Sequence, residues 1–295
     1  MKRIAFIGLG HMGHPMVLNL IKAGYNVNIY DVNTAAMDEL AARGAIPLVS
    51  LAECVTDADI IITMLQNGDQ VKEVCMMNEG IFKNAKQNTL YIDSSSIDIA
   101  TTLYLHAEAE KINLKMLDAP VSGGVAGAMA GTLTFMVGGK ESIYLEAKDA
   151  LEKMGKKIIH AGAASHGQAA KICNNLMLGI SMIAVCEGFN LAEKLGLDTK
   201  KLFEISSNAS AQCWSMTSYC PVPGLVESAP SNKNFEPGFM AKMMLKDLHL
   251  GESAAEHAGA AIPLGQLATQ LYTQFVEQGN GELDFSGIIK MIAAP

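Results

Sequence analysis

A glycine-rich turn between a strand and a helix is the feature that most constrains the fold of this 295-residue chain. The apolar residues up to Ile7 predict a short buried strand. Glycines follow at once at positions 8, 10 and 13, before an apolar helical pattern. A second strand then ends on Asp31, 18 residues beyond Gly13. A lone G-x-G-x-x-G is a weak signal, but this order of strand, glycines, helix, strand and acid is typical of a dinucleotide-binding βαβ unit.

Each glycine of the turn has a separate expected role. Gly8 permits the tight turn, Gly10 lets the backbone approach a pyrophosphate, and Gly13 lets the helix pack closely on the strand. The start of the helix then offers unpaired N–H groups and partial positive charge to the phosphates. The other residues of the turn, also expected to contact the cofactor, are Leu9, His11 and Met12.

The acid at the end of the second strand favours NAD over NADP. The Asp31 carboxylate is placed to accept hydrogen bonds from the adenosine ribose hydroxyls. A 2′-phosphate there would meet a like charge, and no Arg or Lys follows until Arg43. We therefore expect NAD as the cofactor. The alternative is a glycine turn in an α/β domain that binds no nucleotide.

The periodicity of the chain predicts two domains. Up to residue 164, short strands alternate with amphipathic helices, which is typical of a mainly parallel, doubly wound α/β sheet of the Rossmann type. The expected strands are 3–8, 26–31, 45–49, 58–64, 89–93, 114–118, 132–138 and 157–160, with helices at 34–43, 69–77, 97–111 and 141–153. We assign 1–164 to the NAD-binding domain.

From Ser165 onwards strand signals are nearly absent. A helical period runs to about Lys194, roughly 45 Å at 1.5 Å per residue, and we interpret it as a long helix that joins the two domains. Further helices are expected at 199–209, 238–259, 263–279 and 284–292, with a long loop from Cys220 to Gly238. We predict an all-helical domain at 165–295 that binds substrate and forms oligomers.

Composition argues against several classes of protein. With 49% hydrophobic residues, 18% charged residues and a net charge of −8, the chain can bury a core and does not suit nucleic acid. The longest apolar candidate, 176–185, is shorter than the roughly 18 residues of a membrane span, and no targeting segment precedes the first strand. The six cysteines show no C-x-x-C pairing and the histidines no metal-ligand spacing. We therefore expect a cytoplasmic protein with reduced thiols and without a metal or membrane.

Three further motifs carry candidate chemistry. Residues 118–124 end a predicted strand, where ligands gather in open α/β sheets, and their small residues and the Ser122 hydroxyl suit a carboxylate. The alternative is a tight structural turn.

On the long helix, residues 167, 171, 175 and 179 share one face and place Lys171 and Asn175 between glycines. This pattern indicates a site for a small ligand. The alternative is a solvated lysine whose charged end extends outward into water. Lys246 lies in a methionine-rich helix that we expect in the core.

Together these motifs resemble the β-hydroxyacid dehydrogenase family over essentially the whole chain. The resemblance rests on residues 8–13, 118–124, 131–133 and 167–175, supported by 212–215, 221–224 and 244–248. It implies NAD-dependent oxidation of a small 3-hydroxy acid by a homodimer or homotetramer. The last three segments favour 3-hydroxyisobutyrate, from valine breakdown, with methylmalonate semialdehyde as product. Alternatives are reduction of tartronate or succinate semialdehyde and, more remotely, a catalytically inactive dinucleotide-binding scaffold.

The resemblance also implies roles for individual residues. Lys171 matches the general acid and base, and Asn175 matches its partner in catalysis, which positions the substrate. The residues expected to bind substrate are Ser122, Gly123, Gly124, Trp214, Phe239 and Asp247. Those expected to contact the cofactor beyond the glycine turn and Asp31 are Leu65, Ser96 and Lys246. Gln66 departs from the family, whose members usually carry proline at that position.

Overall fold

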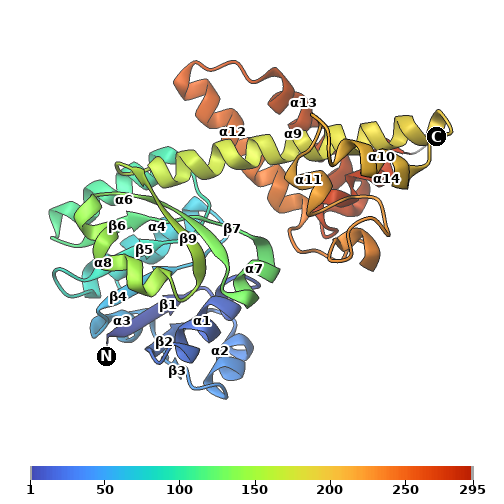
Figure 1. Ribbon diagram of the computed structural model, residues 1–295. Coiled ribbons are helices and arrows are strands. Elements are labelled where there is room, and N and C mark those ends of the chain that lie inside the picture. Colours follow the sequence, from blue (N-terminus) through green and yellow to red (C-terminus); the bar gives the residue numbers. More distant parts are fainter. Residues whose placement is uncertain (1, 294–295) are drawn as a thin grey trace. The chain divides into compact units, whose positions relative to one another are not determined.

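The computed structural model describes residues 2–293, which form two compact units, one ending at Lys171 and the other beginning at Ile172. The first unit is built on a nine-stranded sheet in the order β3-β2-β1-β4-β5-β6-β8-β7, with β9 paired to β8 (Figure 1). Six consecutive strands of this order pair in parallel: β1 (Arg3–Ile7), β2 (Asn26–Tyr30), β3 (Ile46–Pro47), β4 (Ile60–Thr63), β5 (Leu90–Asp93) and β6 (Lys115–Asp118). The predicted doubly wound sheet is confirmed.

The last part of the sheet departs from the parallel pattern. β8 (Leu133–Gly138) pairs antiparallel with β6 and with β7 (Val121–Ser122), and parallel with β9 (Gly155–Gly162). The sequence analysis did not predict β7, because two residues are too short to show an alternation of apolar and polar side chains. Ser122 therefore lies in a short antiparallel strand.

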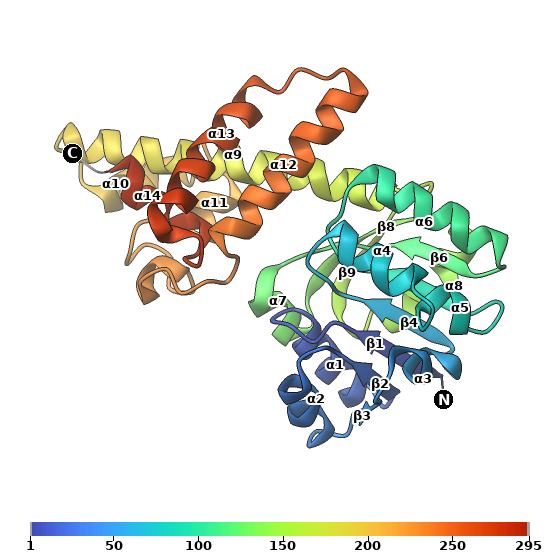
Figure 2. The same cartoon turned by 180° about the vertical axis from the view of Figure 1, so that it is seen from behind.

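Helices cover both faces of the sheet. One layer contains α1 (Gly13–Lys22), α2 (Thr34–Ala41), α7 (Gly124–Ala130) and α8 (Glu141–Leu151), and the other contains α3 (Leu51–Thr56), α4 (Gly68–Met76), α5 (Ile81–Asn84) and α6 (Ile99–Lys111) (Figures 1 and 2). The four predicted helices are present with ends that differ by up to two residues. The unpredicted α3, α5 and α7 are four to seven residues long, too short for a clear helical period.

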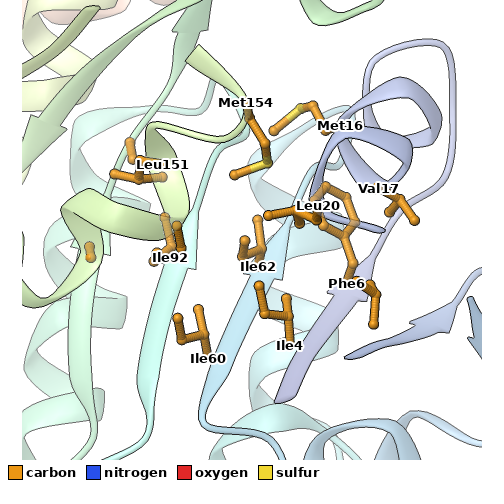
Figure 3. Close-up of a cluster of buried hydrophobic side chains, with 14 of the residues drawn as sticks. Ile4, Phe6, Met16, Val17, Leu20, Ile60, Ile62, Ile92, Leu151 and Met154 are labelled. Carbon is orange, nitrogen blue, oxygen red and sulfur yellow. The ribbon is translucent and has the colours of Figure 1, made fainter. Parts of the chain in front are cut away.

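The alternation of side chains along β1 divides the core between these two layers. Ile4 and Phe6 face α1 and α8, together with residues of β4 and β5 (Figure 3). Ala5 and Ile7 face α3, α4 and α6. Each such aliphatic side chain stabilises the fold by about 1.5–3 kcal/mol when fully buried. A sheet buried on both faces explains why β1 and β4 are apolar at all but one position each.

The second unit is helical, as expected, and α9 (His166–Lys194) leads into it from the first unit (Figure 1). Its other helices are α10 (Thr199–Ser206), α11 (Trp214–Thr217), α12 (Ala241–Ala258), α13 (Pro263–Phe275) and α14 (Ile289–Ile292), with short turns η1 (Pro230–Lys233), η2 (Val276–Asn280) and η3 (Phe285–Ile288). Their apolar faces form one large cluster around Tyr272 and a smaller one around Phe189. Of the described residues beyond 171, two form an isolated β-bridge, Met240 with Asp284.

One expectation about hydropathy was wrong. α9 is long and apolar enough to cross a membrane, with a mean hydropathy of 1.5 over an 18-residue window. The stretch 176–185 is too short by its own length, whereas the mean over 18 residues includes its neighbours and tolerates the polar residues among them. Met182, Ile183 and Cys186 of this helix lie in the larger core cluster, and Val185 and Phe189 lie in the smaller one. Packing within the second unit accounts for the apolar composition.

The cysteines agree with the sequence analysis. All six are free thiols, and four of them, Cys54, Cys75, Cys186 and Cys220, are buried. Burial raises the pKa of Cys54 to about 12, so this thiol stays protonated and unreactive. Between residues 2 and 293, no three His, Cys, Asp or Glu side chains come together as ligands for a metal ion.

A row of buried polar side chains runs through β4 and β5. The Tyr91 hydroxyl lies 3.0 Å from Thr63 Oγ1, which in turn donates to Asp93 Oδ1 at 2.8 Å. The N–H of Ser95 donates to the same carboxylate oxygen at 3.1 Å. The other oxygen, Oδ2, has no hydrogen-bond partner within the described residues. Burial therefore disfavours the carboxylate and raises the pKa of Asp93 to about 6, although the bonds from Ser95 and Thr63 oppose the shift.

We predict that Asp93 makes the stability of the fold fall with rising pH. The folded state holds the proton of Asp93 more tightly than the unfolded chain does, so the free energy of unfolding decreases from about pH 4 through pH 6. Asp93→Asn removes this titration. Its free energy of unfolding relative to the parent should therefore rise by about 1–2 kcal/mol between about pH 4.5 and pH 7. Urea unfolding at both pH values measures the gain. The exposed Asp38→Asn removes an equal charge and should show no gain. An equal difference between Asp93→Asn and the parent at both pH values would contradict the prediction.

Candidate active site

The candidate residues of the first unit follow the carboxyl ends of neighbouring strands. Gly8 follows β1, Asp31 follows β2, Leu65 follows β4 and Ser96 follows β5. The strand order reverses between β1 and β4, and ligands of open α/β sheets bind at such a reversal. A Cβ on Gly8 would lie 2.3 Å from the backbone oxygen of Met64, so the loops after these two strands are in contact.

The glycine turn has the geometry that a pyrophosphate requires. Gly8 has φ +94°, a conformation that favours glycine. A Cβ on Gly13 would lie 1.9 Å from the Gly8 oxygen and 3.1 Å from the Phe6 ring, so α1 packs directly against β1. Gly10 is exposed, and a Cβ there would meet nothing within 4 Å. No side chain caps the first turn of α1, and that turn carries no acid.

Asp31 holds the glycine turn from the side of β2. Its Oδ2 accepts from the Leu9 N–H at 2.6 Å, and its Oδ1 accepts from the Asn33 N–H at 2.8 Å. A carboxylate has about four acceptor positions, so each oxygen keeps one for a ribose hydroxyl. Asp31 is partly exposed, which leaves it open to a ligand. His11 is exposed and Met12 partly buried in the same turn.

The loops after β4 and β5 are tied together. The Leu65 N–H donates to Ser95 Oγ at 2.9 Å, next to Ser96. At Gln66, where the resemblance implies proline, the N–H donates to the side chain of Gln70 at 3.1 Å. A proline would lack that donor. Gln70 thus compensates for the departure from the family pattern within the same loop.

The Ser122-Gly123-Gly124 segment connects β7 to α7. Ser122 pairs with Thr134 of β8 and is partly exposed. Gly123 and Gly124 both have positive φ, +135° and +60°, so the chain turns sharply here. No side chain caps α7 at Gly123. The segment therefore leaves backbone N–H groups and one hydroxyl as donors, the pattern expected for a carboxylate.

Lys171 lies in the second turn of α9 and is only 9% exposed. Lysines are almost never buried this far without a partner or a function. The start of the helix that carries it is held by Asp118 at the end of β6. The Asp118 carboxylate accepts from the Ser165 N–H at 2.8 Å and from the Gln168 N–H at 3.0 Å.

The second unit holds Asn175, one turn beyond Lys171 on α9 and 1% exposed. Its Nδ2 donates to Asp247 Oδ2 of α12 at 2.5 Å, and its Oδ1 accepts from Asn174 at 2.9 Å. Lys246 Nζ lies 3.3 Å from Asp247 Oδ1, an ion-pair distance. Asp247 is buried, so it fixes the orientation of the Asn175 amide.

Trp214 and Phe239 belong to an aromatic cluster in the same unit. Trp214 is 49% exposed and stacks on Tyr219 at 4.8 Å between ring centroids. Tyr219 stacks on Phe285 at 5.4 Å, and Phe285 contacts Phe239 edge-on at 5.6 Å. Trp214 and Phe239, which we expected near a substrate, are therefore linked by ring contacts through Tyr219 and the buried Phe285.

A buried carboxylate anchors this aromatic cluster. Asp284 Oδ2 accepts from the Tyr219 hydroxyl at 2.7 Å and from the N–H groups of Gly238 and Phe239 at 3.0 Å each. Burial raises the pKa of Tyr219 far above its ordinary value, and the neighbouring Asp284 charge adds to the shift. Tyr219 therefore keeps its proton and acts as a donor.

Comparison with known proteins identifies the family. Residues 3–162 match the NAD binding domain of 6-phosphogluconate dehydrogenase, and residues 165–292 match the family described as NAD-binding of NADP-dependent 3-hydroxyisobutyrate dehydrogenase. A probable mitochondrial 3-hydroxyisobutyrate dehydrogenase of Dictyostelium discoideum is 47% identical over 285 residues, covering 97% of this chain and 89% of the relative. The chain belongs to the 3-hydroxyisobutyrate dehydrogenase family.

Two further relatives of this family bear on the substrate. An NAD-dependent L-serine dehydrogenase of Pseudomonas aeruginosa is 43% identical over 291 residues, covering 99% of this chain and 98% of the relative. A solved structure of Mycobacterium tuberculosis 3-hydroxyisobutyrate dehydrogenase with L-serine is 46% identical, covers 100% of both chains and has a TM-score of 0.94. The resemblance and the fold drawn from the motifs are confirmed. The protein is an oxidoreductase of this family, and its cofactor is a nicotinamide dinucleotide, NAD.

The residues present fit that cofactor. Gly10 leaves open space where a side chain would otherwise project. No side chain caps the first turn of α1, and this turn contains no acidic residue. Both features suit a pyrophosphate. Gly8 to Gly13 would hold the phosphates and Asp31 the adenosine ribose.

No role was predicted from the sequence for four residues that bind candidate residues or the segments that carry them. Asp118 and Gln168 were read only as members of motifs, although an acid at a strand end and a glutamine at a helix start are both able to form caps. Tyr219 and Asp284 lie 65 residues apart, and no local pattern in the sequence connects them.

We predict that alanine at two glycines of the turn separates folding from cofactor binding. Gly13→Ala forces α1 away from β1 and should lower the free energy of unfolding by about 1–3 kcal/mol. Gly10→Ala meets no protein atom, so stability should stay within about 0.5 kcal/mol of the parent while NAD affinity falls about tenfold or more. Thermal unfolding and calorimetric titration with NAD measure the two effects. Parent-like NAD affinity in Gly10→Ala would show that the phosphates do not approach this turn.

Proposed function

We propose that this protein oxidises 3-hydroxyisobutyrate to methylmalonate semialdehyde with NAD, as a step of valine breakdown. The observation that carries the proposal is the buried Lys171 near the start of α9, in a unit with an NAD-binding glycine turn. The relatives named 3-hydroxyisobutyrate dehydrogenase support the choice of substrate. In this proposal residues 1–164 bind the cofactor, and residues 165–295 complete substrate binding and form oligomers.

Lys171 acts as the general base of the proposed reaction. NAD, when bound, supplies the hydride acceptor. Lys171 Nζ, as the neutral amine, takes the proton from the substrate hydroxyl while the carbon–oxygen double bond forms, and it returns this proton in the reverse direction. A lysine can do this without a metal because its ammonium form stabilises the negative charge that develops on the substrate oxygen.

The other residues orient the substrate. The N–H groups after Ser122 and its hydroxyl would bind the carboxylate, and Gly123 and Gly124 would allow its close approach. Asn175, held by Asp247, would position the reacting end of the molecule. Leu65, Ser96 and Lys246 would contact the cofactor, and Trp214 and Phe239 would offer apolar surface to the methyl branch.

L-serine is the second candidate substrate, because one relative is named for its oxidation and another was solved with it. L-serine carries an ammonium group where 3-hydroxyisobutyrate carries a methyl group. Of the residues assigned to the substrate, Asp247 is the one acid. It already binds Asn175 and faces Lys246 at 3.3 Å. A carboxylate with its charge so engaged is a weak partner for a further cation, which favours the methyl-bearing acid.

We also propose a homodimer or homotetramer that is soluble and cytoplasmic. Several large apolar side chains of the helical unit are more than half exposed, namely Met177, Leu191, Leu195, Leu264 and Leu267. An interface between copies of the chain would cover such side chains. Among the described residues the one candidate membrane span is α9, which carries the buried Lys171 and packs into the helical core.

A substrate panel tests the proposed reaction. We expect the highest kcat/KM for 3-hydroxyisobutyrate with NAD, when 3-hydroxyisobutyrate, L-serine, glycerate and 3-hydroxypropionate are each measured with NAD and NADP. An apolar pocket rejects an added hydroxyl by only about 10²-fold, so weak activity with glycerate agrees with the proposal. Preference for L-serine would establish the second candidate. Preference for glycerate would move the assignment to tartronate semialdehyde reduction, and equal use of NADP would refute the role of Asp31.

Lys171→Met tests the role of the lysine. Loss of the general base should lower kcat by about 10²–10⁴-fold, while NAD affinity stays within about threefold of the parent. Methionine has a similar length and suits a buried position, so the fold is expected to persist. Lys194→Met, at the exposed end of the same helix, is the matched control and should keep parent activity. A loss below about tenfold in Lys171→Met would show that Lys171 is not the base.

A further inference from the structure

Gln168 joins the start of α9 to the loop after β5 and to the end of β6 through its side chain and backbone. Its Oε1 accepts from the Ile97 N–H at 3.2 Å, and its Nε2 donates to the Ser95 oxygen at 2.7 Å. Its own N–H donates to Asp118 Oδ2 at 3.0 Å. Gln168 is 0% exposed, so these bonds form away from water. A buried side-chain amide bonded in this way has little freedom to rotate.

The partner on one side belongs to the loop that carries Ser96. Ser95 uses all its polar groups in defined contacts: its N–H binds Asp93, its Oγ accepts from the Leu65 N–H, and its oxygen accepts from Gln168. Gln168 therefore fixes both neighbours of Ser96 in the chain, Ser95 and Ile97. It also reaches the loop of Leu65 through Ser95.

The partner on the other side fixes the beginning of α9. Asp118 is 0% exposed and binds the Ser165 and Gln168 N–H groups, as an N-cap side chain does, but from a distant strand. Its Oδ1 also lies 2.9 Å from His106 Nε2. A Cβ on Gly138 or Gly167 would lie 2.6–2.7 Å from this carboxylate. Two glycines thus make room for the acid at the helix start.

We propose that Gln168 is a positioning residue that holds Lys171 in register with the loop of Ser96. This inference rests on the proposed function, in which Lys171 moves the proton and Ser96 contacts the cofactor. Lys171 follows Gln168 by three residues on α9, within one helical turn. Asp118 caps the backbone at the start of α9 and fixes where the helix begins. The side-chain amide of Gln168 fixes the helix against the 95–97 loop. A displacement of about 1 Å between reacting groups can reduce a rate about 10²-fold.

Two variants separate this role from a general effect on folding. Gln168→Met keeps the length of the side chain and loses both side-chain hydrogen bonds. Gln168→Glu keeps an acceptor for the Ile97 N–H and loses the donor to Ser95. Gln266→Met makes the same substitution at an exposed position of α13 and serves as the control.

The first measurement does not depend on activity. Hydrogen exchange of the Ile97 amide, without cofactor, reports whether its bond to Gln168 is present. We expect exchange at least about tenfold faster in Gln168→Met and near the parent rate in Gln168→Glu and Gln266→Met. Unchanged exchange in Gln168→Met would overturn the proposal, because the contact would then not constrain the loop.

The second measurement is kcat per NADH-binding site, counted by titration with NADH. We expect kcat per site to fall about 10–100-fold in Gln168→Met, less in Gln168→Glu and not in Gln266→Met, with KM for 3-hydroxyisobutyrate within about threefold. A merely structural role would reduce the number of sites and leave kcat per site unchanged, which would overturn the proposal. If the parent oxidises none of the 3-hydroxy acids, the proposed function fails instead, and amide exchange alone decides whether Gln168 constrains the loop.

Discussion

Burial of the parallel sheet on both faces is the constraint on which the first unit depends. All four residues of β4 are buried, so this strand offers no polar surface along its length. The candidate polar residues gather at the ends of the strands, where backbone groups leave the ladder and require new partners. Asp31 after β2 binds the turn after β1, Ser95 after β5 binds the loop after β4, and Asp118 at the end of β6 binds the start of α9.

The same constraint decides which parts of the fold the sequence could predict. β1 and β4 carry clear patterns because each is buried over several residues in a row, and α9 does so because its buried positions recur along 29 residues. All three were predicted from the sequence. β7 and α5 were not predictable in this way, since two and four residues contain no full period. Their positions depend on neighbours in space. The hydropathy of α9 was underestimated because a helix can be apolar on average without any long apolar run.

Candidate site residues were predictable where the chemistry is local. The glycines of the turn and the serine-glycine-glycine segment have backbone conformations that their own residue types allow, so motif and structure agree there. Contacts between distant residues were not predictable. Asn175 and Asp247 are 72 residues apart, and each alone reads as an ordinary polar residue of a helix. The family resemblance named both positions, but the hydrogen bond between them comes from the structure.

The stack of Trp214 on Tyr219 has a practical consequence. Trp214 is the one tryptophan of the chain, and it is half exposed while its ring rests on a neutral phenol fixed by a buried acid. Excitation at the red edge of the protein absorption band therefore selects a single reporter, free of background from any other indole. The emission wavelength of Trp214 depends on the polarity around its ring. A small molecule that binds beside this aromatic cluster would therefore change the fluorescence of the helical unit without any added label.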